Sequence, residues 1–490
     1  MESAVARPTT TSSVNRYYVS FALIIALFVG YLALGYITKA PLVSDNHQNI
    51  RIAYHLVHTG VWGYNSVETP APRPQIRREP LPILGIAAVM IFDPAFNGTY
   101  KIADVAEGRL VTRIKIINVI WAALLTLAIF LLVGELFSYS YKGAIIALVT
   151  ALPTAYFMSF RYVDRMMTEV PASFFMLLAA WLGIRFVRNR STKNAIALGI
   201  ALGLLTLVKA AALYIGLCYI ALLFLVQASR QSGGIAGSFS RLNLIRYALI
   251  AVAMAATISP WVIRNIYTFR TPVVTSRGGD ILAFRALLTE QPFSVSLYLF
   301  TPESYRPMVG KLLGGAPNSE AIANFKGLKK ARWDIYRERM AAAGERYRGS
   351  TRSGPWLSRQ ALGYFAEHPV RYALSGLLFG YRGIWFMNAA AVPNFIAMGA
   401  FLTWFNVLSF ITFVALSIWA LIRRDPVLVA FTGLAFGSFV FYSLLSHNIV
   451  RYSDPITPFV FISLYWWLDV ILRALKQFSA SLVPTHADGG

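Results

Sequence analysis

The chain has 490 residues, of which 57% are hydrophobic and only 14% are charged, and its mean hydropathy is +0.55. Soluble domains carry about 25% charged residues, so this composition excludes a soluble protein and indicates many membrane-spanning segments. A net charge of +23 would suggest nucleic-acid binding in a soluble chain, but in a membrane protein the expected partners are membrane lipids and phosphorylated ligands, and no nucleic acid.

Ten segments are apolar and long enough to be predicted as membrane spans, each of which needs roughly 20 residues. The single cysteine, Cys218, lies within one of them and excludes an intrachain disulfide. The first span follows two arginines but is too long for a signal-peptide core, so we expect an uncleaved anchor. The predicted spans are 17–37, 112–136, 143–160, 170–187, 195–208, 210–226, 247–262, 396–422, 426–445 and 456–472.

Short linkers rich in lysine and arginine predict the orientation of these spans, because such linkers face the cytoplasm. Three of them, at 185–193, 230–246 and 423–424, fall on one side if the N-terminus is cytoplasmic. The C-terminus then lies on the same side, and we expect a multi-pass protein of the cytoplasmic (inner) membrane. This orientation requires 195–226 to form a hairpin of two helices rather than one tilted helix.

Two further apolar stretches, 81–92 and 370–386, are predicted as helices lying in the membrane interface. The first is too short to span, and the second contains two arginines. The chain thereby divides into three parts. We expect an N-terminal transmembrane module at 1–263 with about seven spans and a first extracytoplasmic loop at 38–111. A largely helical extracytoplasmic segment follows at 264–395, and a C-terminal module with about three spans at 396–490.

Most acidic residues fall on the predicted outer side, so acid–base chemistry is expected there. Asp45 follows the first span closely and is a candidate general base, although a solvated loop carboxylate is the alternative. Asp164 and Glu169 flank the outer start of the fourth span, where ionisable groups are costly and often functional. The alternatives are that Asp164 pairs with Arg161 or Arg165, and that Glu169 only favours a helix N-terminus.

Cations on the same side are candidates for binding a phosphate. The helix that ends before Lys209 is short, so Lys209 is expected to be recessed and to face an outer cavity; the alternative is that it reaches the surface. Arg264 ends the seventh span and either binds a phosphate or merely flanks the membrane. His447 and Arg451 follow the ninth span and are further candidates.

Familiar motifs of soluble enzymes are missing from the sequence, which has no phosphate-binding glycine loop, no HExxH and no CxxC. Among the loop histidines His47, His55 and His58, the spacing of His47 and His55 is wrong for one helical face, so we do not expect them to bind a metal. A divalent metal elsewhere in the site is left open, and no cofactor is predicted.

Taken together, several fragments resemble the integral membrane GT-C glycosyltransferases, in particular the superfamily of protein mannosyltransferases and bacterial aminoarabinose transferases. The fragments share the order and topology of that superfamily along nearly the whole chain. They are the acid at Asp45 and the segments 78–82, 164–171, 199–209, 260–265 with 278–279, 368–372 and 451–458.

The resemblance implies an all-α polytopic fold and an inverting transfer of sugar from a polyprenyl-phosphate donor at the outer face. It implies that Asp45 deprotonates the acceptor hydroxyl, that Asp164 positions the donor phosphate, a metal or the acceptor, and that Lys209 and Arg264 hold the phosphate. Secondary candidates for that last task are Arg77 and Arg78.

The sequence departs from many relatives by having one acid rather than two adjacent acids after the first span, which weakens the case for a metal. It also lacks the inserted soluble domain of the eukaryotic enzymes, so a bacterial lipid or polysaccharide acceptor is expected. The sugar, the acceptor and the polyprenyl length stay open. The alternatives are a transporter or flippase of a lipid-linked sugar and a non-catalytic scaffold.

Overall fold

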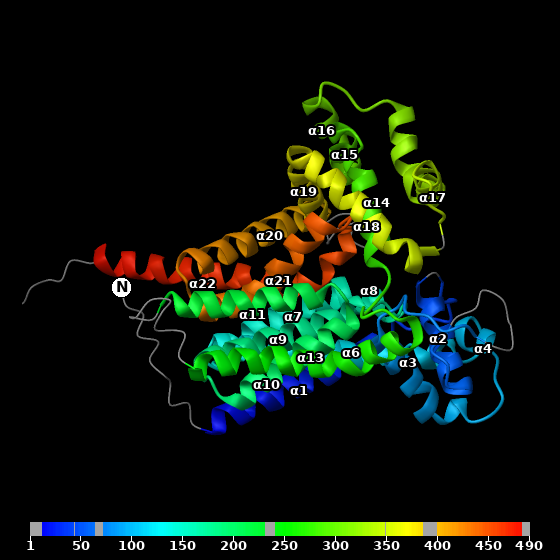
Figure 1. Ribbon diagram of the computed structural model, residues 1–490. Coiled ribbons are helices and arrows are strands. Elements are labelled where there is room, and N and C mark those ends of the chain that lie inside the picture. The colour runs from blue at the N-terminus through cyan, green and yellow to red at the C-terminus, as the bar shows by residue number, and fades with distance from the viewer. Residues whose placement is uncertain are drawn as a thin grey trace, which may run out of the picture.

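The protein is described by a computed structural model that covers residues 12–43, 45–63, 72–230, 241–347, 349–385 and 399–482. Every regular element in these ranges is a helix, and the only strand-like contact among them is an isolated bridge between Gly63 and Pro74. Long helices form a bundle, with shorter helices gathered at one end and above it (Figure 1). The predicted all-α polytopic fold is therefore confirmed.

Each of the ten predicted spans is helical in the part of the chain that the structure describes. Eight helical stretches there are long and apolar enough to cross a membrane, and the two helices of the predicted hairpin are apolar but have only 17 residues each. The start of the span predicted at 396–422 lies outside the described residues. The bundle helices are α1 (Ser12–Leu34), α5 (Val111–Ile114) with α6 (Ile116–Leu136), α7 (Tyr141–Thr154), α9 (Glu169–Arg188), α10 (Thr192–Val208), α11 (Ala212–Ala228), α13 (Arg241–Phe269), α20 (Gly399–Ile422), α21 (Pro426–Leu445) and α22 (Thr457–Leu482).

The hairpin α10–α11 breaks at Lys209, which is the C-cap of α10. Seventeen residues at 1.5 Å each make a helix of about 25 Å, which is less than the roughly 30 Å hydrocarbon core. Lys209 is thereby held below the ends of the longer helices around it.

Close packing of α10 against α13 depends on two glycines one helical turn apart, Gly199 and Gly203, a spacing that lets membrane helices approach closely. A Cβ atom on Gly199 would lie 2.3 Å from the carbonyl oxygen of Ile250, and one on Gly203 would lie 2.5 Å from Cβ of Thr257. Glycine is required at both positions because no side chain fits between the two backbones.

An irregular turn leads into α9. Pro153 lies inside α7 and is followed by a π-helical turn, Ala155–Ser159, and by the short helix α8 (Phe160–Val163). A proline removes one backbone hydrogen bond of a helix, and π-turns often occur at functional sites. The turn delivers the segment from Asp164 to Glu169 to one end of the bundle.

The loop after α1 forms a small helical layer at that same end (Figure 1). Its helices α2 (Asp45–Thr59) and α3 (Pro80–Phe92) pack against each other, and residues such as Ile50 and Ile83 are fully buried between them. Two short helical elements complete the layer, η1 (Pro94–Phe96) and α4 (Ile102–Ala106). The stretch predicted as an interfacial helix at 81–92 is α3, and it also contacts α6 and α10.

A second group of helices stands above the bundle in Figure 1. Asn318 caps the start of the longest helix of this group, because its side chain accepts a hydrogen bond from the Ala321 amide at 2.7 Å. The predicted interfacial helix at 370–386 corresponds to the last of the group, and residue 386 lies outside the described ranges. The helices are α14 (Gly278–Thr289), α15 (Phe293–Phe300), η3 (Glu303–Tyr305), α16 (Arg306–Leu312), α17 (Ser319–Ala342), α18 (Gly349–Glu367) and α19 (Pro369–Ile384).

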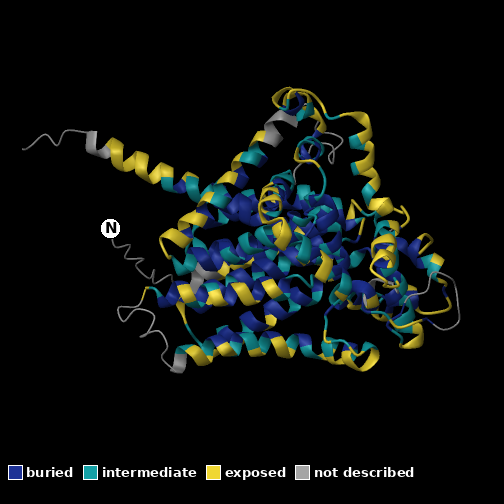
Figure 2. Cartoon of the chain, turned by 45° about the horizontal axis from the view of Figure 1, so that its top comes forward, coloured by how far each residue is buried: buried dark blue, intermediate teal, exposed yellow. Residues whose placement is uncertain are grey.

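Buried residues occupy the centre of the bundle, and exposed residues lie along its outside, as Figure 2 shows. The start of α1 and the end of α22 lie at one end of the bundle, and α2–α4 lie at the other (Figure 1). Two 3-10 turns, η6 (Val450–Tyr452) and η7 (Asp454–Ile456), connect α21 to α22 and bring Arg451 toward the end that carries α2.

Candidate active site

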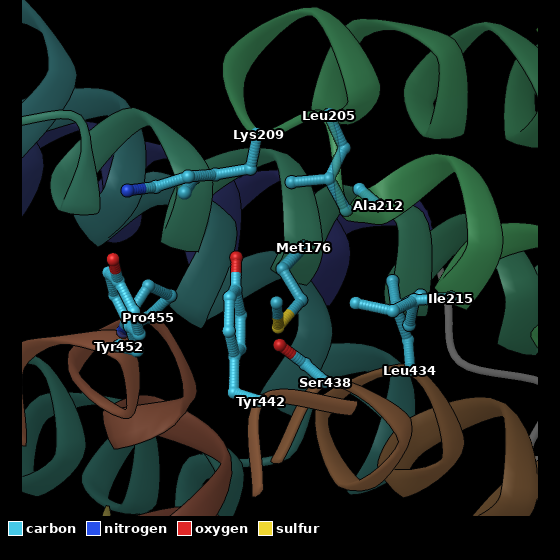
Figure 3. Close-up of a pocket in the computed structure, with 11 residues that line it drawn as sticks. Met176, Leu205, Lys209, Ala212, Ile215, Leu434, Ser438, Tyr442, Tyr452 and Pro455 are labelled. Carbon is cyan, nitrogen blue, oxygen red and sulfur yellow. The ribbon is translucent and has the colours of Figure 1, made fainter. Parts of the chain in front are cut away.

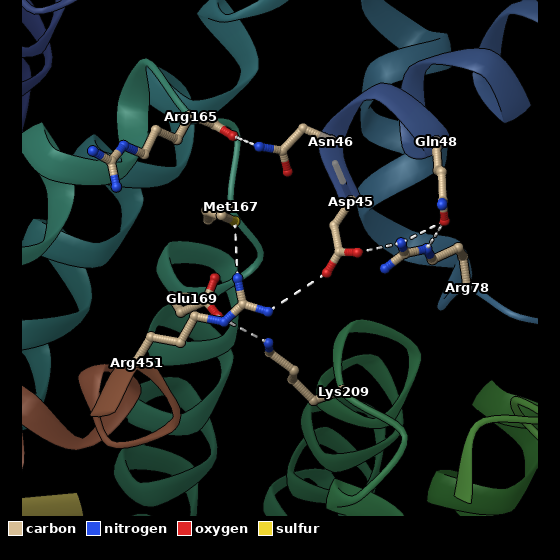
Figure 4. Close-up of polar contacts among 9 residues, drawn as sticks. All are labelled: Asp45, Asn46, Gln48, Arg78, Arg165, Met167, Glu169, Lys209 and Arg451. Carbon is tan, nitrogen blue, oxygen red and sulfur yellow. Dashed lines mark hydrogen bonds and ion pairs between the residues drawn. The ribbon is translucent and has the colours of Figure 1, made fainter. Parts of the chain in front are cut away.

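Asp45 lies in the first turn of α2 and is held between two arginines (Figure 4). Arg78, on the segment leading into α3, donates from Nη2 to Oδ1 of Asp45 at 2.6 Å and also bonds Oε1 of Gln48. Arg451 donates from Nη2 to the other carboxylate oxygen of Asp45 at 3.5 Å. The loop after α1 and the segment before α22 therefore meet at one carboxylate.

A second carboxylate, Glu169, lies beside this pair in the first turn of α9 and is only 1% exposed. Its Oε1 atom is 3.3 Å from Nζ of Lys209 and 3.7 Å from Nε of Arg451. Arg451 thus bridges Asp45 and Glu169, and Lys209 points at Glu169 from the opposite side, as Figure 4 shows. Burying a carboxylate is costly unless cations such as these lie beside it.

Lys209 also lines a small apolar cavity of about 20 Å³ between α9, the α10–α11 hairpin, α21 and the turns before α22. Its ammonium lies 5.9 Å from the ring centroid of Tyr452, and Tyr442 and Ser438 lie below it (Figure 3). The side chain of Lys209 is partly buried and lies where polar and apolar surfaces meet.

The electrostatics of Asp45 favour its ionised form. Burial alone would raise the pKa of Asp45, but the hydrogen bond and charge of Arg78, together with the charges of Arg277 and Arg451, lower this pKa well below its usual range. Asp45 is therefore a carboxylate at neutral pH. It becomes a stronger base only when one of its guanidinium partners moves away.

Asp164 does not join this cluster in the described contacts. Its Oδ1 atom accepts from Nζ of Lys115 at 2.7 Å and from the amide of Thr38 at 2.7 Å. The considered pairing with Arg161 or Arg165 is not what the structure shows, because Arg161 lies 3.9 Å from Asp454 instead. Asp164 therefore fixes the end of α1 to α6.

Arg264 also lies apart from Lys209 in these contacts. Its guanidinium donates to the carbonyl oxygens of Gln75 at 2.9 Å and Trp62 at 3.2 Å and stacks on the ring of Trp261. Arg264 holds the loop after α1 against the end of α13.

Two other candidates lie around the cluster rather than in it. Burial and the charge of Arg277 lower the pKa of Arg77, and Asp280 opposes this shift. His447 is buried, and its pKa is lowered to about 3 by burial and by nearby arginines, of which Arg382 contributes most. His447 is therefore neutral at physiological pH and does not bind an anion by charge.

A metal centre is not formed by the residues that the structure describes, since they contain no group of three or more histidine, cysteine, aspartate or glutamate side chains able to hold an ion. The predicted candidates Asp45 and Asp164 each face cations. We therefore derive no chemical step through a metal.

Several partners escaped the sequence analysis. Lys115 is fully buried under Asp164, but in the sequence it looks like an ordinary flanking cation at the start of a span. Gln48 was overlooked although it lies one helical turn after Asp45, a spacing that places both on one face. In the sequence, Tyr442 and Tyr452 resemble aromatic residues at a membrane interface. Only the folded structure shows that they line the same cavity as Lys209.

Residues 101–263 match the model of the family described as dolichyl-phosphate-mannose-protein mannosyltransferase. This match covers about a third of the chain and includes Asp164, Glu169 and Lys209, but ends one residue before Arg264. The predicted resemblance to this superfamily of membrane glycosyltransferases is thereby confirmed for that segment. No curated protein matches the chain.

Two solved structures illustrate the likeness in architecture. The archaeal oligosaccharyltransferase AglB from Archaeoglobus fulgidus, in complex with an inhibitory peptide and a dolichol-phosphate, is 16% identical over 94% of this chain and 52% of that chain, with a TM-score of 0.48. ArnT from Cupriavidus metallidurans, bound to undecaprenyl phosphate, is 14% identical over 89% of this chain and 78% of that chain, with a TM-score of 0.35. The present chain spans about half the length of the archaeal protein.

Proposed function

We propose, with the family match over residues 101–263 as the premise, that the chain is a membrane glycosyltransferase. It moves a sugar, with inversion, from a polyprenyl-phosphate donor to a hydroxyl group of a lipid or polysaccharide acceptor of the cell envelope. The observation that carries the proposal is the meeting of Asp45, Glu169, Lys209 and Arg451 beside an apolar cavity. The cavity, at about 20 Å³, has room for little more than one water molecule, so in this proposal the phosphate reaches the cations of the cluster and the polyprenyl chain lies outside the cavity.

The donor phosphate binds, in this proposal, to Lys209 and Arg451. Both cations are paired with Glu169, so a phosphate with two or more oxygens competes with one carboxylate for them. Movement of Arg451 toward the phosphate lengthens its 3.5 Å contact with Asp45. Binding of the donor thereby raises the basicity of Asp45 at the moment when a base is needed.

The reaction then requires one proton transfer and one exchange of bonds. The acceptor oxygen forms a bond to the anomeric carbon while its proton passes to Asp45. The bond between that carbon and the phosphate oxygen breaks, and its electron pair stays on the departing polyprenyl phosphate. Lys209 and Arg451 stabilise the charge that develops there, which is the electrostatic contribution expected in such sites. Arg78 stays with Asp45 and orients it.

Three other candidates receive supporting roles. Asp164 keeps the loop that carries Asp45 at the end of the bundle through Lys115 and Thr38, and Arg264 does the same for residues around Gln75. Arg77 adds positive charge near the acceptor side. The end of the bundle that carries α2 faces the outside of the cytoplasmic membrane, and both termini are cytoplasmic.

Replacement of the proposed base provides the test. Purified protein in lipid vesicles is incubated with a polyprenyl-phosphate-linked radioactive sugar and an envelope glycolipid extract, and transfer is followed by mass spectrometry. Asp45→Asn is expected to fold normally and to lose transfer by about 10³-fold or more, since a general base contributes roughly 10²–10⁴-fold. The matched control is Glu107→Gln, an exposed acid in the same loop, which keeps full activity.

Full activity of Asp45→Asn would contradict the assignment of the base but not the proposed reaction. Movement of the lipid-linked sugar across the vesicle without a covalent product would instead favour a flippase. The family match argues against that alternative, because the description of the family names a transferase.

A further inference from the structure

A second, larger cavity lies outside the candidate active site and shares no lining residue with the cavity at Lys209. Its volume is about 460 Å³, and it is formed by α14, α15, the end of α18 and α19. Its wall is largely apolar, with Leu288, Phe293, Leu378 and Phe379 among the lining residues. Nothing in the proposed transfer reaction uses this cavity.

A buried cation lies directly behind this wall. The side chain of Arg285 is completely buried, and its guanidinium bonds Oγ1 of Thr289 at 2.6 Å and Oγ of Ser375 at 2.9 Å, two hydroxyl groups that line the cavity. It also stacks on Phe379 at 3.9 Å from the ring centroid. Its hydrogen-bond acceptors among the described residues are all uncharged, and its Nε atom has no acceptor.

An uncompensated buried charge is costly, and proteins normally place an opposite charge beside it. None of the ion pairs between described residues includes Arg285. Burial accordingly lowers the pKa of Arg285 to about 9, which leaves it charged at neutral pH. The rim adds another cation, Arg371, which bonds only backbone carbonyl oxygens at the end of α14. Glu367, the carboxylate in the lining, is exposed at the mouth.

The mouth of the cavity adjoins the proposed outer membrane surface. α19 packs against α21, and the hydroxyl of Tyr372 donates to the carbonyl oxygen of Leu444 near the end of that span at 3.0 Å. Apolar side chains on α19 point away from the protein: Val370 is 72% exposed, Leu374 47% and Leu377 72%. Val370 and Leu374 also line the cavity.

We propose that this cavity binds an anionic phospholipid of the outer leaflet. Its phosphate lies over Thr289 and Ser375, whose hydroxyl hydrogens are already donated to the carbonyl oxygens of Arg285 and Tyr372. The attraction is therefore the charge of Arg285, acting through a wall of low dielectric, together with the charge of Arg371 at the rim. Its acyl chain leaves the cavity over Leu374 and Val370 into the membrane. A soluble anion would match the charge but not the apolar lining and mouth, so the occupant is a lipid.

Leu374 and Leu377 provide a matched pair for the test, because both are exposed on α19 but only Leu374 lines the cavity. The full chain is purified in detergent, and binding of phosphatidylglycerol is measured by native mass spectrometry against diacylglycerol with the same acyl chains. We expect a preference for phosphatidylglycerol. Leu374→Asp weakens its binding roughly tenfold to a hundredfold, the effect of losing one to two strong contacts, and Leu377→Asp leaves it unchanged.

Arg285→Met tests the contribution of charge. Methionine fills similar space without the desolvation cost, so the variant is expected to melt at the same or a higher temperature and to lose the preference for phosphatidylglycerol. Equal binding of the two lipids by the unmodified chain would overturn the proposal, as would equal effects of the two aspartate variants. If Arg285→Met does not fold, the leucine pair alone decides.

Inorganic phosphate distinguishes a lipid from a free anion. At millimolar concentration it is expected not to displace phosphatidylglycerol, and full displacement would overturn the assignment of a lipid. Sugar transfer is measured on the same samples. Because the cavity lies apart from Asp45 and Lys209, a failed lipid test leaves the proposed transferase activity standing, and loss of transfer in Asp45→Asn leaves lipid binding standing.

Discussion

Arg451 contacts two carboxylates that come from different parts of the chain, Asp45 and Glu169. Each cation proposed to bind the donor phosphate is thus already paired with a carboxylate of the protein. Internal pairing keeps a dense set of charges stable in a partly buried place. The affinity for the donor is therefore the free energy of the ion pairs with the phosphate minus that of the ion pairs with the protein's own carboxylates. Removing Glu169 is expected to strengthen donor binding, and removing Lys209 to weaken it.

Acid pH affects Asp45 and Asp280, a buried acid in the first turn of α14, in opposite directions. The pKa of Asp45 is lowered, so its contribution to stability is complete above its ordinary range near pH 4 and is lost only as the pH falls further. Burial raises the pKa of Asp280 to about 6, although Arg77, Arg277 and Arg332 oppose this shift. The neutral form of Asp280 therefore stabilises the fold below pH 4, and this contribution is lost as the pH rises through 6.

The substitution Asp280→Asn tests the predicted direction in which the stability contribution of Asp280 changes with pH. At pH 7.5 the variant is expected to be more stable than the unmodified chain by on the order of 2 kcal/mol, because asparagine does not carry the buried charge. At pH 4 the difference should vanish. Thermal melting of the purified protein in detergent at both pH values provides the measurement, with the exposed Asp334→Asn as control. A stabilisation that is equal at both pH values would show that charge is not its cause.

At the residue level, the sequence identified candidate site residues by their position next to the ends of predicted spans. Asp45 and Lys209 were singled out because their distance from a span fixes their depth, and the structure places both at the cluster. Arg264 and Asp164 satisfied the same rule and yet bond other partners, Gln75 and Lys115. The end of a span predicts how deep a residue lies in the membrane but not on which side of the bundle it lies. That position depends on how the helices pack.

Helices of the bundle were predicted well because long apolar runs leave few other structures in a membrane. The hairpin α10–α11 was predicted from its length and from the orientation of the basic linker that follows. The π-turn after Pro153 was not predicted. Its proline is a signal for a break but does not specify how the helix continues.

The contact of α10 with α13 fixes the helix that ends at Lys209. Gly203→Ala is expected to destabilise the protein by roughly 1–3 kcal/mol, as overpacking does, because the new Cβ atom would lie 2.5 Å from Cβ of Thr257. Transfer activity should fall with stability as α10 shifts. Melting curves and activity at two temperatures measure both.

Gly327→Ala is the control for this change. Gly327 lies on α17, where an added Cβ atom would have nothing within 4 Å, so the same substitution should be neutral or stabilise the helix by up to about 1 kcal/mol. If the two substitutions had equal effects, close packing of α10 and α13 would not explain the two glycines.

The predicted orientation of the whole molecule in the membrane can be tested directly. The single cysteine, Cys218, is replaced by serine, and one new cysteine is introduced at a time. Lys329→Cys on α17 is expected to react with a membrane-impermeant maleimide added outside intact spheroplasts. Lys193→Cys in the basic linker should react only after the membrane is opened. Both lysines are exposed, so access to the reagent depends on the side of the membrane, and reversed labelling would reject the orientation.

Contacts between distant segments are the part of the molecule that the sequence does not reveal. The division into spans and extracytoplasmic segments follows from composition, but the contact of Asp45 with Arg451 joins residues 406 positions apart. Local patterns carry no information about such a pair. The same holds for Arg285, whose hydroxyl partner Ser375 lies 90 positions away.

The contact between Asp45 and Arg451 also has a consequence for biosynthesis. A ribosome makes Asp45 early and Arg451 only when most of the chain has already entered the membrane, so the nascent protein lacks a bridging arginine for most of its synthesis. The carboxylates of α2 and α9 therefore have no contact with this arginine until the last part of the chain has been made. A chain released prematurely would therefore carry the early spans without a complete charge cluster. We expect such a fragment to be inactive and to be degraded as an incompletely folded protein.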